Sequence, residues 1–188
     1  DIPDIDALAD SLDDEAAAGH PAHESFHNAT KLLAGRLDTA SPVMTGDSPA
    51  ASVVAEHAAR MLFAVSGIVC AAAELADAAR VAVEWSARTG ASVEDSIFYD
   101  PEIDGPRSSP APRVFVATTA DREWFTRQRV AALADAELLL AGRAGRPDEP
   151  PMPGGPRGID PSVDGPGELA SFMVVLLRIE MAAVYLRL

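Results

Sequence analysis

The chain has 188 residues, enough for one domain with a full core, and 48% of them are apolar, which excludes a disordered protein. Its formal net charge of −14, from 29 acidic and 15 basic residues, opposes binding to nucleic acid and to anionic membranes. Cys70 is the only cysteine, which excludes an intrachain disulfide, so we expect a cytoplasmic protein.

The first forty residues predict a helical arm ahead of the main domain. Residues 1–15 are acidic, lack the basic and apolar segments of a secretory leader, and place apolar residues at helical spacing. A second helix is predicted over residues 28–37, with Asn28 as its N-cap. We therefore divide the chain into an N-terminal helical arm, residues 1–40, and a domain, residues 41–188.

Three histidines, His20, His23 and His27, lie between these two helices. Spacings of three and four residues suit zinc binding on a helix. Gly19 and Pro21 interrupt a regular helix here, and the sequence offers no obvious fourth ligand. We predict a solvated linker and no metal site.

A strand, a turn and a helix open the main domain. Apolar residues 42–44 predict a short strand, and residues 45–48 predict the turn after it. Ser48 followed by Pro49 combines a capping hydroxyl with proline at the first helical position, and Gly67 is a helix-ending residue. A helix is therefore predicted from Pro49 to about residue 66.

Strands and helices alternate along the rest of the chain. Apolar patterns predict buried strands over residues 68–72, 113–119 and 137–140, and helices over residues 75–88, 121–136 and 168–188. Asp121 is the predicted cap of its helix. Residues 92–113 and 142–167 are rich in proline and glycine and predict loops. This alternation predicts an α/β fold, a three-layer α/β/α sandwich with a parallel sheet of about four or five strands.

Several isolated polar residues have structural interpretations. Arg178 and Glu180 would each cost about 2.5–3.5 kcal/mol at a bilayer centre, so we predict that the last helix is a buried or interface helix. Glu180 is expected in an ion pair, with Arg178 of a second copy or with another arginine. Cys70 is expected to be a small buried hydrophobe and His57 a surface residue.

Five segments of the chain resemble one protein family. They are the runs Glu-Ser-Phe-His-Asn-Ala-Thr-Lys at 24–31, Leu-Ala at 33–34, Pro-Val-Met-Thr-Gly-Asp-Ser-Pro at 42–49, Asp-Ser-Ile-Phe-Tyr-Asp-Pro-Glu-Ile-Asp-Gly-Pro at 95–106, and Glu-Met-Ala-Ala-Val-Tyr-Leu at 180–186. Together they resemble the second half of bacterial and archaeal bifunctional phosphoglucose/phosphomannose isomerases, whose two halves are sugar isomerase (SIS) domains. The run at 95–106 looks like a loop of the actinobacterial branch. The resemblance implies a SIS-like fold and either a homodimer or pairing with another SIS domain.

The residues that carry the family's chemistry do not match. In place of the family's Asn-Glu-Asn-Ala-Lys run the chain has Phe-Ala-Val-Ser-Gly at residues 63–67, and residues 76–81 replace its His-Asn-Glu motif. The family's active-site lysine lies in a terminal segment without a counterpart in these residues. The resemblance therefore implies an isomerase-like protein that has lost its catalytic Glu, His and Lys, and we assign no catalytic residue. The alternatives are an active aldose–ketose isomerase with substituted residues and a non-enzymatic dimerisation or interaction module.

The candidate substrate-binding residues are Thr45, Gly46, Asp47 and Ser48. Backbone amides at the start of the helix, together with two hydroxyls, suit a phosphate or a sugar hydroxyl. Against this, Asp47 adds a negative charge and Pro49 removes one amide donor, so ordinary turn and capping chemistry is the alternative. We expect a sugar phosphate as the ligand and no cofactor.

Overall fold

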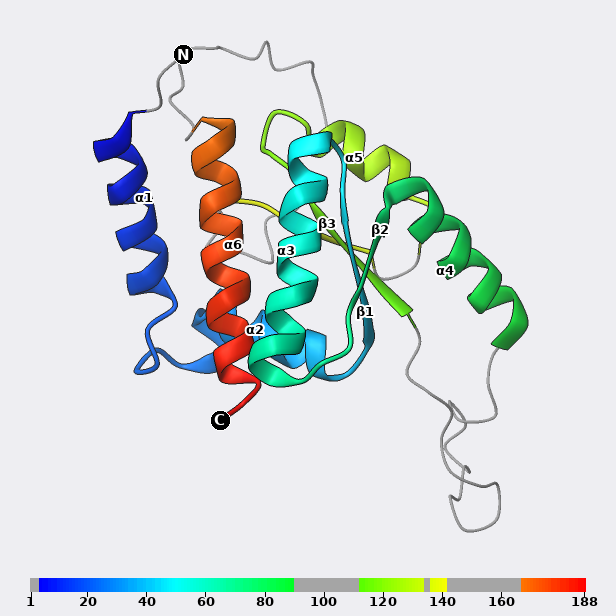
Figure 1. Cartoon of the computed structure of the whole chain (residues 1–188), viewed down its shortest axis with the longest axis horizontal. Helices are drawn as coiled ribbons and strands as arrows, with labels where there is room; N and C mark the ends of the chain where they lie inside the picture. The colour runs from blue at the N-terminus through cyan, green and yellow to red at the C-terminus, as the bar shows by residue number, and fades with distance from the viewer. Residues whose placement is uncertain (1–3, 90–111, 134–135, 142–166) are drawn as a thin grey trace.

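The computed structural model describes four ranges of the chain, residues 4–89, 112–133, 136–141 and 167–188 (Figure 1). The loops predicted over residues 92–113 and 142–167 lie almost entirely outside these ranges. The described residues form an α/β fold built on one sheet.

In the described part of the chain four strands form a parallel sheet, which confirms the predicted sheet type and strand number. They are β1 Ser41–Gly46, β2 Ala71–Glu74, β3 Pro112–Ala117 and β4 Glu137–Leu139. Their order is β2-β1-β3-β4, so the two longest strands form the centre of the sheet. Gly46 lies opposite Ala117 in the parallel register, which brings the carboxyl ends of β1 and β3 level with each other.

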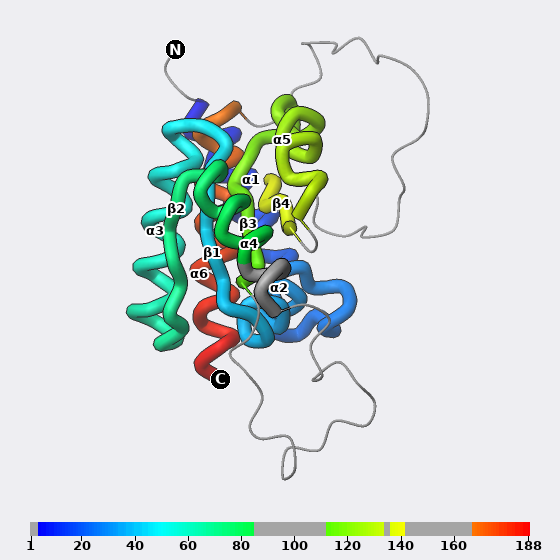
Figure 2. The backbone as a smooth tube through the Cα atoms, turned by 90° about the vertical axis from the view of Figure 1, so that its right-hand side faces the viewer, coloured from blue at the N-terminus to red at the C-terminus, as the bar shows by residue number. Residues whose placement is uncertain are grey.

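Helices cover both faces of the sheet, which confirms the three-layer α/β/α sandwich. One face is covered by α3 Pro49–Ser66 and α6 Glu168–Tyr185. The other face is covered by α4 Leu75–Thr89 and α5 Glu123–Val130. Figures 1 and 2 show the central strands between these two helical layers.

The N-terminal segment packs on the main body of the fold. It contains α1 Ile5–Ala18, the short 3-10 helix η1 Ser25–His27 and α2 Ala29–Asp38. Both α1 and α2 contact α6, and Leu37 of α2 is fully buried in the larger apolar cluster. The proposed division of the chain at residue 40 stays a prediction.

Side chains of the central strands alternate between two apolar clusters. Met44 and Phe115 pack in the larger cluster with α2, α3 and α6. Val114 and Val116 pack in the smaller cluster, which also contains residues of α4 and α5. β3 is thus covered on both faces, as its uninterrupted apolar run predicts.

The start and end of α3 follow the predicted capping chemistry. The Ser48 hydroxyl accepts a hydrogen bond from the Ala51 amide at 3.2 Å, and Pro49 occupies the first turn. Gly67 ends the helix with a φ of 76°, a left-handed conformation that favours glycine. The prediction of this helix from the sequence is confirmed.

β2 differs from its prediction in place and in burial. It spans Ala71–Glu74 instead of residues 68–72, and three of its four residues are exposed. The reason is its place at the edge of the sheet, where small alanine side chains are open to water. Cys70 is half-buried beside it, and desolvation raises the pKa of its thiol to about 11, which keeps the thiol neutral.

α5 is shorter than predicted. It begins at Glu123 and ends at Val130, whereas the sequence pattern suggested residues 121–136. Asp121 does not cap it: the Asp121 carboxylate accepts a hydrogen bond from the Thr119 hydroxyl inside the preceding turn. The helix was predicted too long because the residues of the turns on both sides of α5 continue its sequence pattern.

A buried ion pair holds α1 against α6. Both carboxylate oxygens of Glu15 accept hydrogen bonds of 2.6 Å from Arg178, and Arg178 Nη1 also donates to the Leu140 carbonyl at 2.8 Å. The side chains are 5% and 9% exposed, respectively. Such a pair needs its full set of hydrogen bonds because water no longer solvates the charges.

No helix in the described part of the chain is long and apolar enough to cross a membrane. α6 instead buries much of its apolar surface against α3, α2 and α1, as predicted for a buried helix.

Replacement of Glu15 by Gln should destabilise the protein by about 3–5 kcal/mol, because it leaves the Arg178 charge buried without its partner. The measurement is the free energy of unfolding from urea denaturation. Glu84→Gln is the control, since Glu84 pairs with Arg80 on the exposed surface of α4 and should cost about 1 kcal/mol or less. Equal effects of the two substitutions would contradict a structural role for the buried pair.

Candidate functional site

The candidate site lies between β1 and β3, where successive strands are added to opposite sides of the parallel sheet. After β1 the chain passes through α3 to β2 on one side, and after β3 it passes through α5 to β4 on the other. α3 and α5 lie on opposite faces of the sheet, so the carboxyl ends of β1 and β3 form a topological switch point (Figure 1). Parallel α/β proteins bind ligands at this position.

Asp47 lies at the switch point, directly after β1, and its side chain is 1% exposed. Its Oδ2 atom accepts hydrogen bonds from the hydroxyls of Thr118 and Thr126, both at 2.6 Å, and from Arg122 Nε at 3.1 Å. We call these four residues the switch-point cluster. The cluster ties the end of β1 to the end of β3 and to α5.

Arg122 is the basic member of the switch-point cluster and reaches the surface. Its Nη2 donates to the Asp47 carbonyl at 2.8 Å, and its side chain is 44% exposed. The two bonds to Asp47 hold the guanidinium at the carboxyl end of β1, so a positive charge is fixed there in a strongly acidic protein. Arginine at such a position suits phosphate, because its planar donors match the phosphate oxygens.

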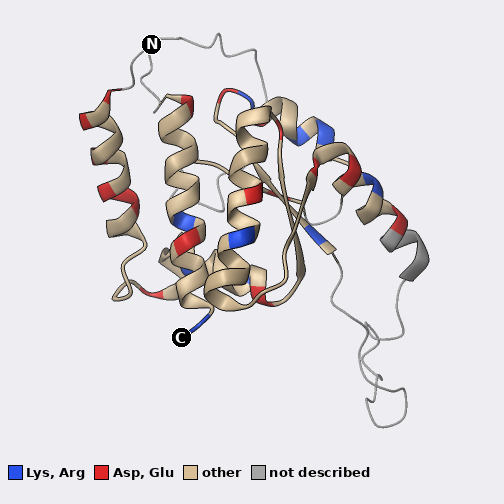
Figure 3. Cartoon of the chain, in the orientation of Figure 1, with Lys and Arg blue, Asp and Glu red and all other residues tan. Residues whose placement is uncertain are grey.

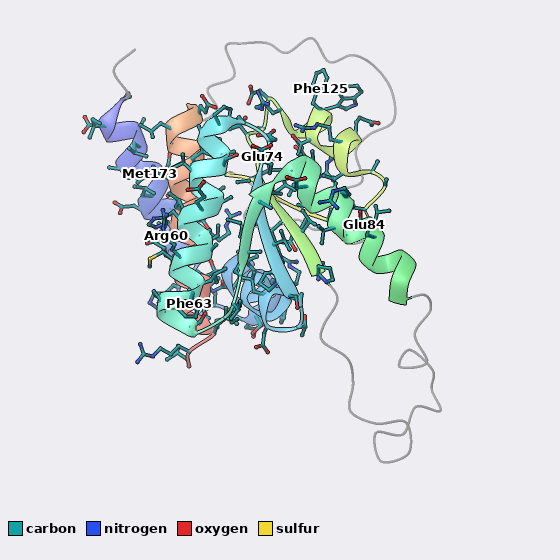
Figure 4. All side chains as sticks on the ribbon, turned by 45° about the vertical axis from the view of Figure 1, so that its right-hand side comes forward. Arg60, Phe63, Glu74, Glu84, Phe125 and Met173 are labelled. Atoms are coloured by element: carbon teal, nitrogen blue, oxygen red, sulfur yellow. The ribbon has the colours of Figure 1, made fainter. Side chains whose placement is uncertain are left out.

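Two exposed aromatic residues follow Arg122 in the sequence. Trp124 and Phe125 are 65% and 68% exposed, and their rings meet edge to face with centroids 5.2 Å apart. Figure 4 shows Phe125 projecting from α5 away from the sheet. Aromatic surface next to a few convergent polar groups is typical of small-molecule sites.

Two buried oxygens at the end of β1 have no hydrogen-bond partner among the described residues. They are Asp47 Oδ1 and Thr45 Oγ1. Alternate residues of a strand point to the same face, so both side chains lie on the face of the sheet that α4 and α5 cover. Buried polar atoms are normally paired, and these two leave capacity for a hydroxyl or water donor.

Gly46 and Ser48 shape the joint between β1 and α3. A Cβ atom on Gly46 would overlap the backbone of Ala51 and Ser52, so glycine lets the first turn of α3 approach the strand. Ser48 caps α3 through the Ala51 amide, and the Ser52 hydroxyl donates to the Ser48 carbonyl at 3.0 Å. Both residues therefore support the geometry around Asp47.

The four residues predicted to bind substrate occupy different environments. Thr45 and Gly46 belong to β1, which extends two residues further than expected, while Asp47 and Ser48 form the turn. Ligand binding at these positions stays a prediction. Thr118, Arg122 and Thr126 were not predicted as site residues, because only the strand order brings them to Asp47. The sequence did contain one indication for Thr118, because it is a polar residue directly after the continuous apolar run of β3.

The three histidines lie between α1 and α2, are exposed and take no part in the switch-point cluster. His20 Nδ1 accepts the Ala22 amide at 3.2 Å, and His23 Nδ1 contacts the Ala18 carbonyl at 3.1 Å. Both rings therefore interact with the local backbone. Among the described residues, no group of three or more His, Cys, Asp or Glu side chains is placed to hold a metal ion.

Glu180 has a different partner from the one expected. Its Oε1 lies 3.0 Å from His57 Nε2, so the pair joins α6 to α3 at a half-exposed position. Arg178 pairs with Glu15 instead, because it lies on the side of α6 that faces α1. His57 and Glu180 take no part in the switch-point cluster.

Burial also shifts the pKa of the Glu137 carboxyl group in β4. Desolvation raises the pKa of the Glu137 carboxyl above its usual range, although Arg36 and Arg113 oppose the shift. Arg36 Nη2 lies 2.8 Å from Glu137 Oε1. This ion pair joins α2 to β4, so its role is structural.

Comparisons of the chain with protein-family models, curated proteins and solved structures find no match. The resemblance to SIS-domain isomerases therefore stays a prediction.

Gly46→Ala should destabilise the protein by about 1–3 kcal/mol, because the added methyl overlaps helix backbone that has no room to move. Gly35→Ala in α2 is the matched control: nothing lies within 4 Å of its added methyl, and a helical alanine should stabilise by about 0.5–1 kcal/mol. Thermal unfolding of both variants measures the difference. Tolerance of alanine at position 46 would contradict the close approach of α3 to β1.

Proposed function

We propose that this chain is a SIS-like protein that binds a sugar phosphate at the switch point and has lost the family's catalytic residues. The observation that carries the proposal is Arg122, which the buried Asp47 carboxylate holds half-exposed at the carboxyl end of β1. The start of α3 adds the favourable end of a helix dipole.

Each part of the switch point has a role in the proposal. The Arg122 guanidinium binds the phosphate, while the Ser48 hydroxyl adds a hydrogen bond. Asp47 positions Arg122 through its buried carboxylate. Trp124 and Phe125 offer apolar surface to the sugar ring.

We propose that the site binds the sugar phosphate but does not catalyse its isomerisation. General acid–base isomerisation needs a titratable group at the substrate. The only carboxylate of the cluster already accepts hydrogen bonds from two threonine hydroxyls and one guanidinium. The single cysteine supports a cytoplasmic location, where sugar phosphates are found.

Arg122→Gln should weaken sugar-phosphate binding by roughly tenfold or more, the effect of losing charge-assisted hydrogen bonds to phosphate. Isothermal titration calorimetry with fructose 6-phosphate and glucose 6-phosphate measures the affinity, and unphosphorylated glucose tests the need for phosphate. Arg80→Gln removes the same charge from the exposed surface of α4 and should leave binding unchanged.

Two results would contradict the proposed binding site. One is the absence of binding to the wild-type protein at millimolar sugar phosphate. The other is equal affinity of the wild-type and Arg122→Gln proteins, once circular dichroism has shown that the variant is folded.

Fructose 6-phosphate incubated with the protein should yield no glucose 6-phosphate or mannose 6-phosphate above a heat-inactivated control. The expected result follows from the absence of the family's catalytic Glu and His at the matching positions. Coupled enzymatic assays for both products provide the measurement. Turnover well above the control would support an active isomerase with substituted residues.

A further inference from the structure

The outward surface of α3 carries apolar residues at its ends and opposite charges between them. Val53 and Phe63 are 64% and 63% exposed. Glu56 and Arg60, the only charged residues of α3, are exposed between them. Figure 3 shows one acidic and one basic band on this helix, and Figure 4 shows Arg60 and Phe63 on its side away from the strands.

α6 extends this surface on one side. Met173 and Val184 are 38% and 52% exposed, and they lie eleven residues apart, which places them on the same side of the helix. Glu180 lies between them and contacts His57 of α3 at 3.0 Å, which joins the two helices. We call Val53, Glu56, Arg60 and Phe63 of α3, with Met173 and Val184 of α6, the α3–α6 face.

Glu56 and Arg60 have no ion-pair or hydrogen-bond partner among the described residues. The two charges are therefore available to a partner on the same face. A partner surface of one sign would satisfy one charge and repel the other. A surface with both signs in reverse order would satisfy both.

The positions on α3 are symmetric about position 58. Glu56 and Arg60 each lie two residues from it, and Val53 and Phe63 each lie five residues from it. When two copies of α3 pair antiparallel across a two-fold axis at this position, Glu56 of each copy meets Arg60 of the other. The same axis brings Val53 of each copy to Phe63 of the other. Such self-complementarity is what an isologous interface requires.

We propose that the α3–α6 face binds the same face of a second copy of this chain, with the two-fold axis beside position 58 of α3. The two central ion pairs set the register, and Val53, Phe63, Met173 and Val184 supply the apolar contact. The interface lies on the helical layer opposite α5, so the switch point stays accessible in the dimer. The inference does not depend on sugar-phosphate binding.

Charge reversal tests the register of this dimer. Glu56→Arg gives a face with two positive charges, and Arg60→Glu gives a face with two negative charges. Each single variant should weaken self-association by at least about tenfold, because like charges then meet across the axis. The double variant, Glu56→Arg with Arg60→Glu, restores both pairs and should dimerise as the wild type does.

A mixture of the two single variants makes the sharper experiment. One variant presents only positive charges and the other only negative charges, so an equimolar mixture should form heterodimers although neither protein dimerises well alone. Sedimentation velocity of the separate and mixed proteins measures this. Glu84→Arg on α4, outside the face, is the control for a general change in net charge and should leave dimerisation unchanged.

The proposal is overturned by a wild-type protein that remains monomeric at high micromolar concentration. It is equally overturned by single variants that dimerise as tightly as the wild type, or by a mixture that forms no heterodimer. Circular dichroism and thermal unfolding of each variant confirm that the compared proteins are folded.

Discussion

The Asp47 carboxylate is the constraint on which the candidate site depends. It is buried at the junction of β1, β3 and α5, where an unsolvated charge is stable only with good hydrogen bonds. Two threonine hydroxyls and one guanidinium supply those bonds to a single oxygen. The need to satisfy this charge fixes the position of Arg122, and so couples the packing of the sheet to the electrostatics of its carboxyl edge.

This arrangement bears on the anion binding that we propose for a strongly acidic protein. The overall charge of −14 disfavours anionic ligands at long range, but at contact distance the guanidinium and the start of α3 dominate. Asp47 reduces the field of Arg122 while it restricts the motion of the side chain. The gain is preorganisation, since Arg122 loses little conformational freedom when a ligand binds.

α3 connects the site to the opposite surface of the molecule. Its N-terminus follows Asp47 directly, its inner side packs against the sheet, and its outer side carries the self-complementary charges of the α3–α6 face. α6 contributes in a similar way: Arg178 binds Glu15 of α1, while Glu180 contacts His57 of α3. Removal of one partner costs more stability in the buried pair than in the half-exposed pair, because the charge left behind in the interior has no alternative solvation.

The sequence by itself determined the class of the fold and the start of α3, because strand patterns, the Ser48–Pro49 cap and Gly67 act through neighbouring residues. It also identified Asp47 as a candidate, through its place after an apolar strand. Local patterns could not identify Thr118, Arg122 or Thr126 as its partners, since 71 to 79 residues separate them from Asp47. They also could not show that β2 is exposed or that Arg178 binds Glu15, because strand order and helix packing decide both. Tertiary structure alone brings distant residues together, and burial then determines which of their charges must be paired.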